Sequence, residues 1–334
     1  MATPEIGSPT RARIVRVGAG ATLGADVAGG KGASLDRLTR LGLAVPPAFC
    51  VSADAFREQL ASVTDPTTLA RLLGALPDEA ARAELVAAFD ARPTLAGLSR
   101  AIGDAVEGLV RELDAALGQG ASPAGPGSSG PQAFAVRSSA LDEDGSTASF
   151  AGLHETELGR VAGEVEDAIR RCWSSLWSIP AVSYRARRGT RFDDLAMAVV
   201  VQVLVPAESS AVLFTRHPVS GRDDRILLTA IRGLGEPMVS GEATPDTIVV
   251  DRASRAIVER TPGRPGMRQF VEGGRIVERS DSLPTAVLSD EAVAALVELA
   301  LTVEAGVGAP VDIEAAHAGG RWFLLQSRPI TAGR

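Results

Sequence analysis

Hydrophobic positions divide the chain into a largely helical first part and a strand-rich second part. Between residues 52 and 118 the apolar residues recur at helical spacing, as at Leu98 and Ile102, which predicts helices with one buried face. Ser52 stands before the first of these helices as its expected N-cap. From residue 133 onward, short apolar runs separated by glycine-rich turns predict strands.

The strand-rich part contains one long apolar segment and several shorter ones. Residues 197–205 form a nearly continuous apolar run, which indicates a buried strand. Residues 289–305 are amphipathic at helical spacing and begin at Ser289, a residue type that caps helices. Further strands, the third and fourth expected as a hairpin, are predicted at residues 212–214, 226–228, 247–251, 256–259, 310–316 and 322–326.

Composition narrows the classes of function. With 334 residues the chain can bury a substantial core. Its net charge of -7 argues against general nucleic-acid binding. No run of 18 apolar residues predicts a membrane span, and residues 1–10 lack the apolar segment of a secretory signal, so a cytoplasmic location is expected. The two cysteines, Cys50 and Cys172, are far apart and predict neither a disulfide framework nor a zinc site.

Lysine usage singles out one position. The chain has 34 lysine and arginine residues together, yet Lys31 is its single lysine. Lysine offers a compact point charge that the planar fork of arginine does not reproduce. Lys31 lies in a glycine turn, AGGKGASL at residues 28–35, before an expected short helix, and such a turn presents N–H groups to an anion. We therefore expect Lys31 to contact phosphate, with chance survival of the lysine as the alternative.

Two common nucleotide-binding motifs do not fit this region. A P-loop requires serine or threonine directly after the lysine, but Gly32 follows Lys31. A dinucleotide fingerprint beginning at Gly18 would require glycine where Leu23 stands, and no strand with an acidic end follows at the required distance. A dehydrogenase is therefore a weak interpretation.

Two segments in the middle of the chain carry further phosphate-binding chemistry. The segment FAVRSSA, residues 134–140, predicts a strand whose Arg137 can bind phosphate through two parallel hydrogen bonds. The segment STASFAG, residues 146–152, offers hydroxyl and backbone N–H groups that can cover phosphates. The alternative for this second segment is an ordinary surface turn.

Two predicted strands near the end of the chain place polar side chains on one face. Asp312 and Glu314 are separated by one residue, and so are Gln326 and Arg328. Side chains two apart in a strand share a face, and paired carboxylates on one face favour a cation such as Mg²⁺ between them. The pattern predicts a site for magnesium and a triphosphate, with surface ion pairing as the alternative for Asp312 and Arg328.

Ten segments of the chain occur in the order found in the nucleotide-binding domain of phosphoenolpyruvate synthase and pyruvate phosphate dikinase. They read GGKGASL, VPPAF, FAVRSSA, TASFAG, CWSSLW…SYR, MAVVVQVLV, SAVLFTRHPVSG, GLGEPMVSGEATPD, DIE and LLQSRPI. On these segments, from about residue 15 to residue 331, the chain resembles this family, whose domain the rifampicin phosphotransferase family shares.

The resemblance implies the ATP-grasp fold, an α+β fold in which two lobes with mixed or antiparallel sheets close on ATP. It implies a tail at residues 1–14, a first lobe at residues 15–195 and a second lobe at residues 196–334 that carries the carboxylates for metal and phosphate. Within the first lobe, the Gly-, Pro- and Ser-rich residues 119–132 are expected to form a flexible loop.

The resemblance also implies the roles of individual residues. Catalytic roles at the phosphates fall on Lys31, Arg137 and Arg328. Nucleotide contacts, including those of Lys31 and Arg137, are further implied for Gly30, Thr147, Ser149, Gly152, Gln202, Leu204, Glu236, Asp312 and Gln326. Binding of Mg²⁺ is implied for Glu314, Gln326 and Asp312.

The implied activity is that of an ATP-dependent phosphotransferase of the dikinase type, with ATP and Mg²⁺ as its cofactors. Members of the family pass a phosphoryl group from ATP to a histidine on a mobile domain and release AMP. His154, His217 and His317 do not stand in the Thr-Ser-His setting of that histidine, so we expect a histidine domain supplied in trans. Departures from the family pattern, at residues 153–154, 210–212 and 315–317, concern the acceptor side.

Two alternatives remain. One is a stand-alone ATP-grasp kinase or ligase that acts directly on a small molecule, which the sequence does not separate from the first interpretation. The other is a non-catalytic nucleotide-binding module, which the intact set of phosphate and metal residues disfavours.

Overall fold

The computed structural model describes residues 12–118, 132–141 and 156–330, apart from residues 188, 190, 193–194, 219–220 and 283–285. The expected tail at residues 1–14 and the expected loop at residues 119–132 therefore lie mostly outside the described part of the chain. The predicted phosphate-covering positions Thr147, Ser149 and Gly152 lie wholly outside it.

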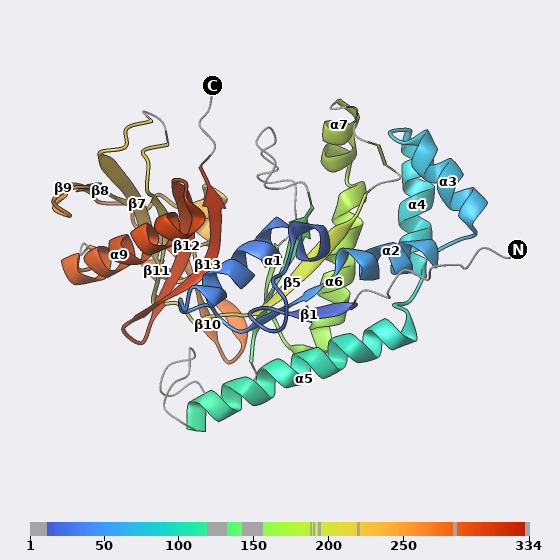
Figure 1. Cartoon of the computed structure of the whole chain (residues 1–334), viewed down its shortest axis with the longest axis horizontal. Coiled ribbons are helices and arrows are strands. Elements are labelled where there is room, and N and C mark those ends of the chain that lie inside the picture. Colours follow the sequence, from blue (N-terminus) through green and yellow to red (C-terminus); the bar gives the residue numbers. More distant parts are fainter. Residues whose placement is uncertain are drawn as a thin grey trace, which may run out of the picture.

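Two antiparallel sheets form the centres of two lobes, with helix α1 (Ala25–Arg40) between them (Figure 1). The first sheet has the strand order β1-β2-β5-β3-β4. Its strands are β1 (Ile14–Arg16), β2 (Ala48–Val51), β3 (Phe134–Ala140), β4 (Thr156–Arg160) and β5 (Met197–Val203). Helix α1 covers one face of this sheet, and the other face packs against helices of residues 53–187.

The two faces of the first sheet follow from the alternation of its side chains. Val199 and Val201 of β5 face the helical layer, while Val200 between them faces α1. All seven residues of β5 are buried, which confirms the prediction of a buried strand from the apolar run. The helical layer consists of α2 (Ala53–Ala61), α3 (Pro66–Ala75), α4 (Glu79–Ala91), α5 (Ala96–Gly118), α6 (Val165–Ser174) and α7 (Ile179–Arg187), with short 3₁₀ turns η1 (Ala162–Glu164) and η2 (Ser175–Trp177).

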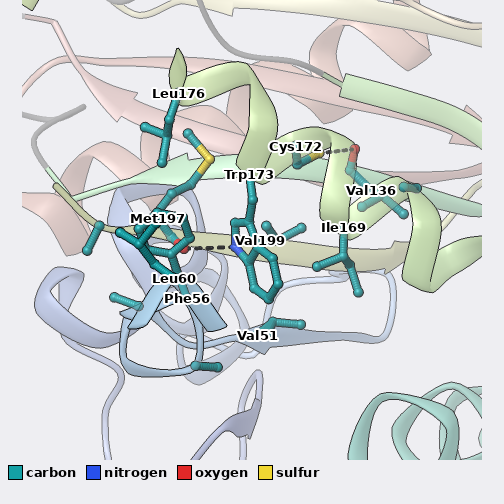
Figure 2. Packing of buried hydrophobic residues seen from close by; sticks show 14 of the residues in the cluster. Val51, Phe56, Leu60, Val136, Ile169, Cys172, Trp173, Leu176, Met197 and Val199 are labelled. Atoms are coloured by element: carbon teal, nitrogen blue, oxygen red, sulfur yellow. Dashed lines mark hydrogen bonds between the residues drawn. The ribbon is translucent and has the colours of Figure 1, made fainter. Parts of the chain in front are cut away.

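Trp173 of α6 lies at the centre of this first core (Figure 2). Its ring meets Phe56 edge-on, with centroids 5.8 Å apart, and its Nε1 donates to the carbonyl oxygen of Met197 at 3.2 Å. The buried indole thus has a hydrogen-bond partner, as its polar atom requires. The contact ties α6 to the start of β5.

The second sheet has the strand order β13-β12-β6-β7-β8-β9 and is covered by helix α9 (Asp290–Val307). Its strands are β6 (Ser209–Phe214), β7 (Arg225–Arg232), β8 (Asp246–Asp251), β9 (Ile257–Thr261), β12 (Val311–Ala318) and β13 (Arg321–Pro329). A one-turn helix, α8 (Glu236–Val239), follows β7. Among the described strands, β10 (Gly266–Glu272) and β11 (Arg275–Asp281) pair only with each other.

Side chains of helix α1 contact both lobes. Leu38 packs into the core of the second lobe, whereas Leu35 packs beneath the first sheet. Ser34 Oγ donates to the carbonyl oxygen of Ser327 in β13 at 2.6 Å, and Leu324 N donates to the carbonyl oxygen of Ala44 at 2.8 Å. These contacts hold β13 against the first lobe.

The structure confirms an α+β chain with antiparallel sheets and most of the predicted elements. Ser52 and Ser289 accept hydrogen bonds from Ala55 N and Ala292 N, as expected of N-caps. The strand β5, which the expected boundary at residue 196 places in the second lobe, pairs with β2 and β3 of the first sheet. We propose that the second lobe begins after Val203. The hairpin β10–β11 was missed, because most of its side chains are exposed or only half-buried.

No helix in the described part of the chain is long and apolar enough to cross a membrane.

Candidate nucleotide site

A cavity of about 450 Å³ lies between the two sheets and is lined by residues of both lobes. Much of its apolar lining belongs to one cluster of side chains, which includes Ala135, Leu158, Leu204, Leu234, Ala316 and Leu325. Its polar and charged lining includes Lys31, Arg137, Gln202, Glu236, Glu314, Gln326 and Arg328. The cavity therefore gathers seven residues that sequence analysis selected as charged or polar site residues.

The glycine turn is held against β3 by close backbone contact. Helix α1 is interrupted at Gly29, where φ is 67° and ψ is 175°. A Cβ added at Gly29 would lie 2.1 Å from the carbonyl oxygen of Ser139, so only glycine fits this position. Ser139 Oγ donates to the carbonyl oxygen of Ala28 at 2.8 Å and accepts from Gly32 N at 3.2 Å. The short helix expected after the glycine turn is therefore the part of α1 that resumes at Gly30.

Lys31 lies in the first turn after this interruption and lines the cavity. Its side chain is 8% exposed, and Nζ donates to the carbonyl oxygen of Ser138 at 2.8 Å. The turn and β3 together thus hold the ammonium group at the cavity wall. Gly30 is buried and is not part of the cavity lining.

Arg137 reaches from the first lobe to the second. One of its nitrogens, Nη2, donates to Glu314 Oε2 and to Gln326 Oε1, each at 2.9 Å, and Nη1 donates to the carbonyl oxygen of Leu325 at 3.1 Å. The guanidinium is mostly buried, with 12% of the side chain exposed, and the Glu314 side chain is 30% exposed. This fork is the polar centre of the cavity.

The register of β12 and β13 confirms that the four polar residues near the end of the chain lie on paired strands. Glu314 is opposite Gln326, and Asp312 is opposite Arg328. Arg328 lines the cavity with Glu314 and Gln326, whereas Asp312 is outside the lining. A register shift between Glu314 and Ala315 leaves Leu325 of β13 without an opposite residue, so the adjacent residues Leu325 and Gln326 both line the cavity.

Glu236 is the first residue of α8 and enters the cavity from the second lobe. Burial raises the pKa of its carboxyl group, the Arg137 guanidinium lowers it, and the negative charges of Glu314 and Glu242 raise it further, so that the pKa lies above its usual value. A carboxyl group with a raised pKa beside charged partners is a common feature of functional sites.

Gln202 lies at the end of β5 with 2% of its side chain exposed. It lines the cavity, and its Nε2 has no hydrogen-bond partner within the described residues. A buried amide without a partner is costly, so this donor is suited to a ligand. Leu204, two residues on, adds an apolar contact to the same wall.

Several lining residues were not selected from the sequence. They include Thr156 and Leu158 of β4, Ser210 and Val212 of β6, and Met238 and Val239 of α8. These residues carry ordinary strand or turn patterns, and only pairing of distant segments brings them together. Gly233, in the segment GLGE before α8, has a φ of 74°, and its added Cβ would lie 2.1 Å from the carbonyl oxygen of Gln269.

The histidines take no part in the described cavity lining. His317 tilts against Trp322 with ring centroids 5.0 Å apart, and its Nδ1 lies 3.8 Å from Glu208 Oε2. His217 lies in the turn after β6, and His154 is outside the described residues. In the described ranges, no three His, Cys, Asp or Glu residues gather as a metal site.

Comparison with known proteins gives one family and several relatives. The sequence profile of the family described as "Pyruvate phosphate dikinase, AMP/ATP-binding domain" matches residues 25–334. A probable phosphoenolpyruvate synthase of Archaeoglobus fulgidus is 37% identical over 317 residues, which cover 92% of this chain and 40% of that protein. A rifampicin phosphotransferase of Streptomyces is 36% identical over 310 residues, which cover 91% and 34%.

A third relative is a prodigiosin synthesizing transferase, PigC of Serratia marcescens, 36% identical over 325 residues, which cover 95% of this chain and 33% of that protein. The chain thus spans less than half the length of these relatives. Among solved structures, D-alanine–D-alanine ligase of Helicobacter pylori aligns over 59% of this chain and 42% of its own, with a TM-score of 0.27 and 10% identity. A similarity this low supports no inference.

Proposed function

Because the chain belongs to the family of the AMP/ATP-binding domain of pyruvate phosphate dikinase, we propose that it is the ATP-dependent module of a phosphotransferase. The observation that carries the proposal is the Arg137 fork, which joins a cation of the first lobe to Glu314 and Gln326 of the second. Lys31 stands on the same cavity wall. A cavity that combines fixed cations, a carboxylate and an amide oxygen suits a metal-bound polyphosphate.

Three cations share the phosphates in this proposal. Lys31 supplies a point charge beside the glycine turn, Arg137 supplies a planar fork, and Arg328 adds a third charge on β13. Lys31 and Arg137 are held by protein contacts before the nucleotide enters, so little reorganisation of these two cations accompanies charge development in the transfer step. The phosphate contacts of Thr147, Ser149 and Gly152 stay predictions from the sequence.

Glu314 and Gln326 fit Mg²⁺ by their donor chemistry. Mg²⁺ in nucleotide sites is usually held by one or two carboxylates together with the substrate phosphates. Glu314 and Gln326 are cross-strand neighbours whose oxygens already share one cation, the guanidinium of Arg137. Asp312, two residues before Glu314 on the same strand, stays a third candidate ligand. When bound, the metal neutralises negative charge that develops on the transferred phosphoryl group.

The apolar part of the cavity suits the adenine base. Leu204 and the cluster around it provide apolar contact, and the Nε2 group of Gln202 provides a hydrogen-bond donor for the base. We assign Glu236 to a polar contact with the nucleotide, because it shares the cavity with Arg137 and Glu314.

The acceptor in this proposal is a histidine domain supplied in trans, because the residues on the donor side are assembled in one cavity. The second candidate is a small molecule that takes the phosphoryl group directly, favoured by relatives whose names are rifampicin phosphotransferase and prodigiosin synthesizing transferase.

Analysis of nucleotide products separates the two acceptors. The purified chain is incubated with Mg-ATP alone, with a separately produced histidine domain of a phosphoenolpyruvate synthase, and with candidate small molecules. We expect AMP to form when the histidine domain is added and little turnover without it. Robust formation of ADP or AMP with a small molecule and no partner would overturn the trans arrangement. Absence of turnover in all three incubations would contradict the phosphotransferase proposal itself.

A further inference from the structure

The hairpin β10–β11 belongs to neither of the two large sheets, yet it contacts both lobes. Its seven paired positions run from Gly266 opposite Asp281 to Glu272 opposite Arg275. One end of the hairpin is fixed to the second lobe, and the turn at its other end touches the first. No part of the proposed chemistry explains this arrangement.

The end of the hairpin in the second lobe is fixed by backbone and ionic contacts. Leu234 N donates to the carbonyl oxygen of Gln269 at 2.7 Å, and Gly233 approaches the same oxygen too closely for any side chain. Arg232 Nη1 lies 3.1 Å from Asp281 Oδ2 at the end of β11. These contacts join the hairpin to the segment between β7 and α8.

The turn of the hairpin meets the first lobe at β4 and η1. Arg275 Nη1 lies 2.9 Å from the Glu164 carboxylate. Ile276 packs over Gly159 of β4, where φ is 69° and an added Cβ would lie 2.9 Å from Ile276 Cγ1. Glycine at this position therefore lets the hairpin sit directly on the strand.

Both attachment points adjoin the wall of the cavity. Leu158 directly precedes Gly159, and Leu234 directly follows Gly233, and both leucines line the cavity. Val271 and Ile276, which are cross-strand partners, pack against the same apolar cluster as these leucines. The hairpin thus connects a wall residue of one lobe to a wall residue of the other.

We propose that the hairpin is a strap that positions β4 of the first lobe against the α8 segment of the second, and so sets the affinity of the cavity for nucleotide. Arg275 and Ile276 are positioning residues in this role, because they act through Leu158 and do not line the cavity themselves. The link to nucleotide affinity rests on the proposed function, whereas the link between the lobes does not.

The test compares hairpin variants with a matched control on the same hairpin. Arg275→Ala removes the ion pair to Glu164, Ile276→Ala removes the contact with Gly159, and Arg275→Lys retains the charge. Arg279→Ala is the control, because Arg279 pairs with Glu272 within the hairpin itself. Affinity for the non-hydrolysable analogue AMP-PNP with Mg²⁺ is measured by calorimetry at low and high salt.

Lobe separation is measured independently of nucleotide. Spin labels at Ala87→Cys in α4 and Ala295→Cys in α9 report the distance between the lobes, since both positions are exposed and the native cysteines are buried. The strap predicts a broader distance distribution for Arg275→Ala and Ile276→Ala than for the wild type, with AMP-PNP or without it.

Affinity should fall by up to about fivefold for Arg275→Ala, as for an exposed ion pair, and by about three- to tenfold for Ile276→Ala. High salt should narrow the difference between Arg275→Ala and the wild type, and Arg275→Lys should restore most of the affinity. Unchanged distance distributions in both variants, or equal effects of Arg279→Ala, would overturn the strap. Failure of the wild type to bind AMP-PNP would contradict the proposed function alone, because the distance measurement still tests the strap.

Discussion

Replacement of Lys31 by alanine should weaken nucleotide binding without unfolding the chain. The lysine is 8% exposed, and its Nζ donates to the carbonyl oxygen of Ser138 at 2.8 Å. Loss of a hydrogen bond to a charged group costs about 1.5–3 kcal/mol. At about 1.4 kcal/mol per factor of ten, affinity for AMP-PNP should fall about ten- to hundredfold.

Lys31 also contributes to the stability of the fold, separately from nucleotide binding. Removing the donor leaves the carbonyl group of Ser138 without this bond, which costs about 1–3 kcal/mol of stability. Lys31→Arg should not restore binding, because the planar guanidinium fork does not reproduce the compact point charge of the ammonium group.

Calorimetry with AMP-PNP and thermal unfolding of each variant separate the two effects. Arg37→Ala is the control, because Arg37 is an exposed cation on the same helix. Wild-type affinity in Lys31→Ala, or an equal loss in Arg37→Ala, would refute the assignment of Lys31 to the phosphates.

Three further predictions concern other parts of the site. Glu314→Gln should raise the Mg²⁺ concentration needed for half-maximal AMP-PNP binding, while the exposed Glu298→Gln on α9 should not; equal Mg²⁺ dependence in both would contradict the metal assignment. Gly29→Ala should lower the Tm by several degrees more than Gly42→Ala, since both have positive φ but only Gly29 would place a Cβ against Ser139; equal losses of Tm would refute the close approach. Burial raises the pKa of Glu236, so the folded state binds the proton more tightly than the unfolded state, and stability falls as pH rises from 4.5 through the raised pKa. Glu236→Gln should flatten this part of a curve of Tm against pH. An unchanged curve in this variant would contradict the raised pKa of Glu236.

Alternation and motif order predicted much of the second-lobe face of the site. The spacing of Asp312 with Glu314, and of Gln326 with Arg328, predicted one shared face, and the register places the two pairs opposite each other. Not all four residues line the cavity, however: Glu314, Gln326 and Arg328 belong to the lining, and Asp312 does not. Local spacing carries no information about how far along a strand a cavity extends.

Contacts between distant segments could not be predicted in this way. Arg137 and Glu314 are 177 residues apart, and their hydrogen bond depends on how the two sheets are placed by α1. The run at residues 197–205 predicted a buried strand, but an apolar run does not show which sheet the strand joins, and β5 pairs with β2 and β3 of the first sheet. The strand β10 was missed because a hairpin that spans two lobes buries neither face completely.

A crystal structure of the chain with AMP-PNP and Mg²⁺ tests the central claim most directly. The account predicts a triphosphate between Lys31 and the Arg137 fork, the metal ion on the oxygens of Glu314 and Gln326, and the adenine against Leu204 and Gln202. A nucleotide bound outside the cavity, or a metal ion distant from Glu314, would contradict it.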